Sequence, residues 1–131
     1  MYLIDSSVWI DGINGKAKTV KFLRQLSPEA LGINLLIYTE VLQGASTQKL
    51  LNVQQSYLSA QPFYGFQNDK ISHQQAANIY RKCHQNGITP RSTIDCLIAQ
   101  CAIENDLILL HNDKDFVKIA SVMPNLQQTA I

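Results

Sequence analysis

The sequence predicts an α/β protein with a parallel sheet that carries helices on both faces. Short apolar runs typical of buried strands alternate along the chain with amphipathic patterns of helical period. This alternation favours parallel pairing, because parallel neighbours need a long crossover that a helix can provide. The length of 131 residues suits one domain, and we expect a single domain over residues 1–131.

The first elements are a short strand and two short helices. An apolar run over residues 2–4 predicts a buried strand that stops at Asp5. Residue types that cap helices follow, and one or two helical turns should come next. A second short helix is expected within residues 17–28, because Val20 and Leu23 share one face.

The segment 31–61 is the longest helical candidate. We expect a short strand near Ile33–Leu35 and a helix from about Ile37. The later part is amphipathic, and its predicted buried stripe consists of Leu50, Val53, Tyr57 and Leu58.

The second half of the chain repeats the alternation of helix and strand. A brief strand is expected in the aromatic stretch 61–67, followed by a helix over 72–87 that Ser72 should cap. The remaining predictions are a loop, a helix over 92–106, a strand at Leu107–Leu110, a helix over 113–122 and an edge strand within 126–131.

The composition limits the classes of function. A formal net charge of +1 provides no general attraction for nucleic acid, so any such site must be a local patch. The three cysteines are odd in number and lack C-x-x-C spacing, which predicts reduced thiols that fill the core of a cytoplasmic protein. No apolar run reaches the length of a membrane span, and the start of the chain does not resemble a signal peptide.

Other chemical motifs are weak or absent. The three histidines His73, His84 and His111 lack metal-ligand spacing and are interpreted as surface residues. The chain contains no G-x-S-x-G, Walker A or G-x-G-x-x-G sequence. The basic residues between 16 and 24 are interpreted as a solvated face rather than an RNA groove.

Four acidic residues stand where a parallel fold would bring them together. Asp5 ends the first strand, and Asp113 lies just past the strand at 107–110. Glu40 interrupts an apolar stretch, and Asp95 lies in the first turn of its helix. Ligands of open parallel sheets bind beyond the carboxyl ends of the strands, so we expect these carboxylates at one rim.

The chemistry of such a cluster points to a metal ion. Carboxylates close together repel, and the arrangement needs protonation or a cation among them. Oxygen ligands without Cys or His select Mg²⁺ or Mn²⁺, which suits phosphoryl chemistry. Each acid also has a structural interpretation, since Asp5, Asp95 and Asp113 could cap helices and Glu40 could face solvent. Their common placement favours the metal site.

Four stretches of the chain resemble the sequence blocks of PIN-domain ribonucleases, and most of all VapC toxins of type II toxin–antitoxin pairs. The stretches are YLIDSSVWID, NLLIYTEVLQG, RSTIDCLIAQCAIEND and LILLHNDKDF, in the family's order over nearly the whole chain. The resemblance implies a three-layer α/β/α sandwich around a central parallel sheet. It also implies a Mg²⁺-dependent endoribonuclease, with Mn²⁺ as a possible substitute, that forms homodimers. A small cognate antitoxin would inhibit it by placing its tail in the acidic cleft.

The resemblance carries over residue by residue. The family's catalytic and metal-binding acids match Asp5, Glu40, Asp95 and Asp113, with Asp115 as an alternative for the fourth. Its hydroxyl residue after the first aspartate matches Ser6, with Ser7 as a polar companion. The chain departs from the family at the end of the last block, where His111 replaces the usual Thr or Ser that supports the metal carboxylates.

Two surfaces are assigned to partners, and two rival functions remain open. Arg91 and Lys114 are candidates to contact RNA phosphates, although plain surface charge explains them equally well. Antitoxin helices are expected in an apolar groove near Trp9, Val20 and Leu23.

The two rival functions are a receiver-like phosphoacceptor domain and a catalytically inert PIN-like scaffold that binds RNA or protein. The presence of His111 in place of Thr or Ser would favour the inert scaffold.

Overall fold

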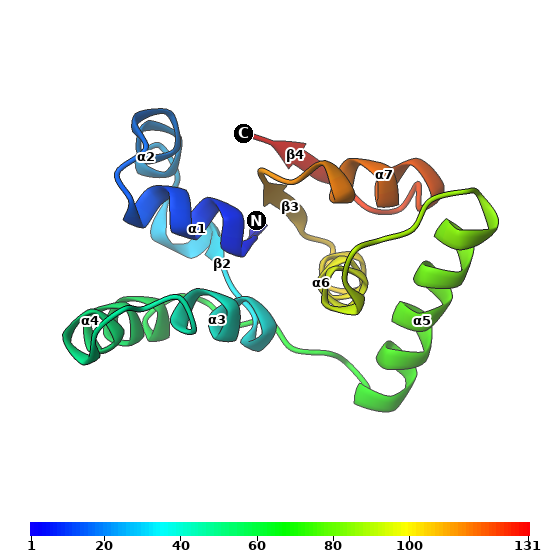
Figure 1. Cartoon of the computed structure of the whole chain (residues 1–131), viewed down its shortest axis with the longest axis horizontal. Helices are drawn as coiled ribbons and strands as arrows, with labels where there is room; N and C mark the ends of the chain where they lie inside the picture. The colour runs from blue at the N-terminus through cyan, green and yellow to red at the C-terminus, as the bar shows by residue number, and fades with distance from the viewer.

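Four parallel strands form the sheet at the centre of the computed structural model, which describes all 131 residues (Figure 1). Their order is β2-β1-β3-β4. Tyr2 of β1 pairs with Leu31 on one side and with Ile108 on the other. The strands are β1 (Tyr2–Ile4), β2 (Leu31–Gly32), β3 (Ile108–His111) and β4 (Gln128–Ala130). Because β1 and β3 are neighbours, the acidic residues that follow both strands reach the same edge of the sheet.

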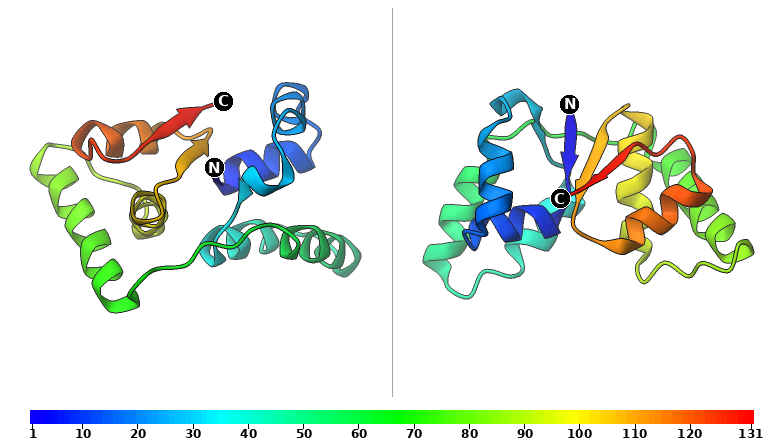
Figure 2. Two further views of the ribbon diagram at one scale, coloured as in Figure 1. Left: turned by 180° about the vertical axis from the view of Figure 1, so that it is seen from behind. Right: turned by 90° about the horizontal axis from the view of Figure 1, so that it is seen from above.

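Seven α-helices enclose the sheet from both sides. The first four are α1 (Ser6–Ile13), α2 (Ala17–Arg24), α3 (Leu35–Leu42) and α4 (Gln48–Ser59). The others are α5 (Asp69–Gln85), α6 (Thr93–Glu104) and α7 (Lys114–Val122). Figure 2 shows α1 to α4 on one side of the strands and α5 to α7 on the other. This arrangement confirms the predicted α/β sandwich with a central parallel sheet.

The core lies along the two inner strands and against the helices that cover them. Leu3, Ile4, Leu109 and Leu110 have no exposed surface. Strands that are covered on both faces are apolar at consecutive positions, and this pattern is why the sequence predicts β1 and β3. All three cysteines are buried free thiols, as predicted. None of the helices combines the length and the apolar character that crossing a bilayer requires.

Gly32 allows the strand β2 to pack tightly. A Cβ atom at this position would collide with the backbone oxygen of Tyr2 and would lie 2.7 Å from the ring of Tyr64. Only glycine therefore fits between the neighbouring strand and the aromatic ring.

The segment after β2 differs from the prediction at several points. The strand ends at Gly32, earlier than expected, and Asn34 caps α3 by accepting a hydrogen bond from the Ile37 amide at 2.9 Å. A break then separates α3 from α4, and Thr47 caps the second helix. Side-chain caps at both starts explain two short helices in place of one long candidate.

The burial of α4 was also predicted wrongly in part. Leu58 is buried as expected, but Val53 is 60% exposed and Tyr57 is 53% exposed. The buried side chains of α4 are those of Gln54 and Leu58, one turn apart. The helix therefore presents a narrow face to the core and leaves much of its apolar stripe open.

Two further predictions were wrong in detail. Helix α5 starts earlier than expected, with Asn68 as its cap, and Ser72 is a buried residue within the helix. The aromatic stretch forms a single bridge between Ile33 and Phe63 rather than a strand. A short 3₁₀ turn at Pro28–Ala30, absent from the prediction, leads into β2.

Candidate metal centre at the carboxyl edge of the sheet

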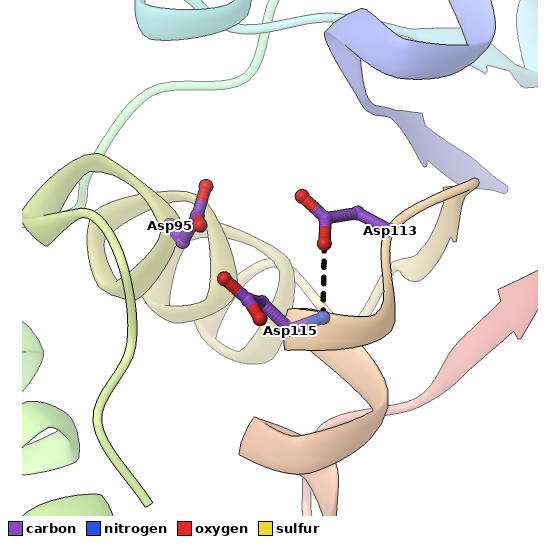
Figure 3. Close-up of side chains that lie close together, drawn as sticks. All are labelled: Asp95, Asp113 and Asp115. Atoms are coloured by element: carbon purple, nitrogen blue, oxygen red, sulfur yellow. Dashed lines mark hydrogen bonds between the residues drawn. The ribbon is translucent and has the colours of Figure 1, made fainter.

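Three aspartates from two elements form the tightest acidic cluster in the molecule. Asp95 lies in the first turn of α6, Asp113 caps α7, and Asp115 lies in the first turn of α7. Each offers a carboxylate oxygen, and these oxygens lie within 4.8 Å of one another. Figure 3 shows the three side chains directed toward a shared space between the two helix starts.

Asp5 stands at the end of β1 and caps α1. Its Oδ2 accepts hydrogen bonds from the amide of Ser7 at 3.2 Å and from its hydroxyl at 2.6 Å. The same hydroxyl oxygen accepts from the amide of Asn112 at 3.1 Å, which ties the end of β1 to the loop after β3. Burial raises the pKa of Asp5 although the Ser7 hydrogen bonds oppose the shift.

Glu40 reaches the same region from α3. The hydroxyl of Ser6 lies 3.4 Å from Glu40 Oε1 and donates to it. Burial raises the pKa of Glu40, and the negative charge of Asp5 raises it further. The hydrogen bond from Ser6, the residue after Asp5, brings the glutamate of α3 close to this acidic region.

Asp95 has the most strongly perturbed carboxyl group of the site. Burial is the largest cause that raises its pKa to about 7, and repulsion by four other carboxylates adds to it. Those carboxylates are Asp113, Asp5, Glu40 and Asp115, in decreasing order of effect. No hydrogen-bond donor of the protein offsets these effects at Asp95. A carboxylate placed among four others, without a donor, is suited to bind a cation.

Asp115 has the opposite environment. Arg91 Nε donates to its Oδ2 at 2.7 Å, and Arg91 Nη2 donates to Asp113 Oδ1 at 3.1 Å. The hydrogen bond from Arg91 lowers the pKa of Asp115. The Asp115 amide also donates to Asp113 Oδ1 at 2.9 Å, so these two acids are held as a pair. Arg91, a candidate from the sequence to contact RNA phosphates, therefore pairs with the acidic cluster in this structure.

His111 was predicted at the surface, and the structure shows it completely buried. It is the last residue of β3, an inner strand covered by helices on both faces, and its ring packs 5.3 Å from the ring of Phe116. Its Nδ1 accepts from the Asp113 amide at 3.1 Å, and its Nε2 lies 2.7 Å from Gln128 Oε1. The only sequence signal for the burial of His111 is that it directly follows the apolar residues of the strand.

The donor set fits a hard divalent cation. All ligand atoms in the cluster are carboxylate oxygens, the type that Mg²⁺ and Mn²⁺ prefer. One cationic side chain, Arg91, faces the Asp113 and Asp115 part of the site. Burial and mutual repulsion raise the pKa values of Asp5, Glu40 and Asp95, so these carboxylates are also suited to a nearby cation.

A second surface feature lies on the side of α1, α2 and α4. An apolar groove of about 400 Å³ is lined by residues that include Trp9, Val20, Leu23 and Tyr57, with Arg24 at its edge. The indole Nε1 of Trp9 is buried and has no hydrogen-bond partner in the chain. The sequence predicts a groove near three of these residues, Trp9, Val20 and Leu23.

The parallel sheet with carboxylates gathered at one edge defines an α/β protein with a candidate site for a divalent metal ion. A model of the PIN domain family matches residues 2–122. Ribonuclease VapC11 of Mycobacterium tuberculosis and a VapC ribonuclease of Mycobacterium bovis are each 36% identical over 131 residues, which cover 97% of this chain and 96% of each relative.

A solved structure agrees with this assignment. The crystal structure of VapBC2 from Rickettsia felis bound to a promoter DNA fragment superposes with a TM-score of 0.78 at 20% identity. The match covers 99% of this chain and 98% of that chain, and it supports the fold. The chain belongs to the PIN-domain family and, within it, to the VapC ribonucleases. Membership of this family removes the receiver-like alternative.

Proposed function

We propose that this chain is a metal-dependent endoribonuclease, the toxin of a type II toxin–antitoxin pair, built as a single nuclease domain that acts in the cytoplasm. The observation that carries the proposal is the acidic cluster at one edge of the sheet, where carboxylate oxygens of Asp95, Asp113 and Asp115 lie within 4.8 Å of one another. Asp5 and Glu40 are near enough to raise the pKa of Asp95 by repulsion. The names of the curated relatives support the ribonuclease activity.

The residues of the chain divide the work at the site. Asp95 and Asp113 would bind Mg²⁺ or Mn²⁺, with Asp5 and Glu40 as further ligands directly or through water. A bound ion would activate a water molecule and stabilise the charge that develops on the scissile phosphate. Ser7 orients Asp5, and the Asp115 amide and Arg91 orient Asp113.

A polar cleft beside the acids suits the RNA backbone. It has a volume of about 510 Å³, and its lining combines Asp113 and Asp115 with the cations Arg91, Lys114 and Lys118. The two lysines have no acidic partner within salt-bridge distance, so their charges are available to phosphates. We assign the substrate strand to this cleft, next to the metal ligands.

The partner proposal rests on the apolar groove. The neighbouring structure from Rickettsia felis is a VapBC complex, and we infer that this chain also binds a cognate antitoxin and forms a homodimer. An amphipathic antitoxin helix would cover Trp9, Val20 and Leu23. A cationic side chain from the same antitoxin would pair with Asp5 and Asp95 in place of the metal.

Cleavage and growth test the proposal together. The purified chain should cleave RNA with Mg²⁺ or Mn²⁺ and should stop when EDTA removes the ion. Expression of the chain alone should arrest growth, and Glu40→Gln should relieve the arrest while circular dichroism shows a retained fold. If the folded wild-type chain neither cleaves RNA nor arrests growth, the inert scaffold is the better description, and His111 is the sequence feature that favours it.

A further inference from the structure

The imidazole of His111 uses both ring nitrogens in the interior of the protein. Nδ1 accepts the Asp113 amide at 3.1 Å, so the ring proton is assigned to Nε2. Nε2 then donates to Gln128 Oε1 at 2.7 Å. The ring therefore connects the edge strand β4 to the backbone of a candidate metal ligand.

The bond to Asp113 is one of a series along the loop. The side chain of His111 accepts the amide two residues further on, and the side chain of Asp113 accepts the amide of Asp115 in the same way. Asp5 and Ser7 form a third bond of this kind at the end of β1. Each of these hydrogen bonds fixes a backbone turn. The direction of the Asp113 carboxylate therefore depends on the turn that His111 fixes.

Gln128 keeps the ring in place from the opposite side. The residue belongs to β4, where it pairs in register with Leu109 of β3, and it is partly buried. The backbone also joins the two strands here, because the Ile131 amide donates to the His111 carbonyl at 3.0 Å. The buried imidazole has a second nitrogen that must also find a hydrogen-bond partner, and Gln128 supplies it, whereas a hydroxyl side chain could accept the amide alone.

We propose that Gln128 and His111 form a positioning pair that sets the Asp113 carboxylate for the metal ion. The inference rests on the proposed function, since it assigns Asp113 as a ligand. His111 contacts the ligand's backbone amide, and Gln128 acts through His111. The edge strand β4 thereby contributes to the metal site although none of its residues reaches the acidic cluster. Groups that orient metal ligands commonly change metal affinity about 10- to 100-fold when they are removed.

Two substitutions at His111 separate positioning from stability. His111→Asn keeps an oxygen that can accept the Asp113 amide, while His111→Leu fills the core better and accepts nothing. Mn²⁺ affinity is measured from the free ion in electron paramagnetic resonance titrations, and the melting temperature is measured without metal. We expect His111→Leu to lose about 10-fold or more in affinity and His111→Asn to retain most of it. The metal-free melting temperature should show the reverse order.

A second pair of variants isolates Gln128. Gln128→Met removes the acceptor for Nε2 and keeps the length of the side chain. Gln127→Met makes the same change at the exposed neighbouring residue, whose side chain has no hydrogen-bond partner. We expect weaker Mn²⁺ binding for Gln128→Met, with a smaller loss than for His111→Leu, and unchanged binding for Gln127→Met.

The outcomes separate this inference from the proposed function. Equal Mn²⁺ affinity for His111→Leu and His111→Asn would refute the proposed positioning role of His111. If the wild-type chain still binds Mn²⁺, the proposed metal site would stand. Equal Mn²⁺ affinity for Gln128→Met and Gln127→Met would show that Gln128 is not part of the positioning pair. A wild-type chain that binds no Mn²⁺ would instead refute the metal site.

Discussion

The two ends of helix α6 each hold a partly buried carboxylate in opposite surroundings. Glu104 at the last residue accepts hydrogen bonds from the amide of Gln67 at 2.9 Å, the hydroxyl of Ser72 at 2.8 Å and the side chain of Gln100 at 3.1 Å. Asp95 in the first turn has four other carboxylates near it and a pKa raised to about 7. The same functional group is thus saturated with donors at one end and surrounded by like charge at the other.

This difference distinguishes a structural acid from a ligand. A carboxylate with several donors connects the elements that supply them, and Glu104 joins α5 and the segment before it to α6. A carboxylate among other carboxylates is destabilised in the folded state until a cation or protons arrive. The free energy lost at Asp95 is recovered when a cation binds or when the carboxylate takes up a proton, so this end of the helix is the one suited to hold a metal ion.

The largest effect should come from exchanging the acid for an amide at each end of α6. Asp95→Asn should lower metal-dependent RNA cleavage at least about 100-fold, because loss of one ligand charge weakens ion binding and charge stabilisation. Glu104→Gln should leave cleavage within about 3-fold, since its donors lie away from the ion. Single-turnover cleavage at saturating Mg²⁺ measures both. Comparable losses in the two variants would contradict the distinction between a ligand at one end of α6 and a structural acid at the other.

A similar comparison sharpens the roles of the two aspartates at α7. Asp113→Asn should reduce cleavage about 100-fold and Asp115→Asn about 10-fold. The reason is that the hydrogen bond from Arg91 lowers the pKa of Asp115, whereas Asp113 is the carboxylate that contributes most to the raised pKa of Asp95. The assay is cleavage with circular dichroism as the check on folding. A larger loss at Asp115 would identify it as the fourth ligand.

Stability should change in opposite directions at the two ends of α6. Glu104→Ala should lower the free energy of unfolding by about 2 kcal/mol, because buried donors on Ser72 and Gln100 lose their acceptor. Asp95→Asn should raise it by about 1 kcal/mol at pH 7.5 in EDTA, because like-charge repulsion is removed. Urea denaturation of both variants tests the signs. Destabilisation by Asp95→Asn without metal would contradict the view that Asp95 is uncompensated.

The smallest effect concerns pH. The folded-state pKa of Asp95 is about 7, above its ordinary value of 3.8, so the folded chain binds more protons than the unfolded chain between these values. Stability without metal should therefore fall as pH rises from about 4 to 7, and Asp5 and Glu40 shift it in the same direction. Asp115 has a lowered pKa and contributes stability that is lost only below this range.

Melting temperatures in EDTA between pH 5 and 8 measure this slope. The decrease should be smaller in Asp95→Asn. Mg²⁺ should cancel the decrease in the melting temperature of the wild-type chain, because more carboxylates are deprotonated at higher pH and the ion then binds more tightly. A wild-type melting temperature that rises with pH in EDTA would refute the raised pKa values.

Local patterns were sufficient for the elements around the site. The strands β1 and β3 were found as apolar runs, and their adjacency brought Asp5 and Asp113 to one edge as expected. The start of α6 at Ser92 followed from its capping pattern. These features depend on neighbouring residues in the chain, whose periodicity and capping preferences are local properties. The roles of the four acids stay predictions until the variants are measured.

Other features were decided by residues far apart in the sequence. The exposure of Val53 and Tyr57 depends on how little of α4 faces the core. Two of the donors to Glu104, the amide of Gln67 and the hydroxyl of Ser72, lie more than 30 residues earlier in the chain. Such contacts arise when the chain closes around its core, and no local pattern in the sequence encodes them.

The sequence by itself determined which residue types could bind a metal and where each stood relative to a strand or helix end. The tertiary structure alone decided their environments: Arg91 beside Asp115, no donor beside Asp95, and His111 buried between Asp113 and Gln128. The physical reason is that burial, repulsion and hydrogen bonding depend on distances across the fold. A carboxylate's charge state therefore follows from its neighbours in space.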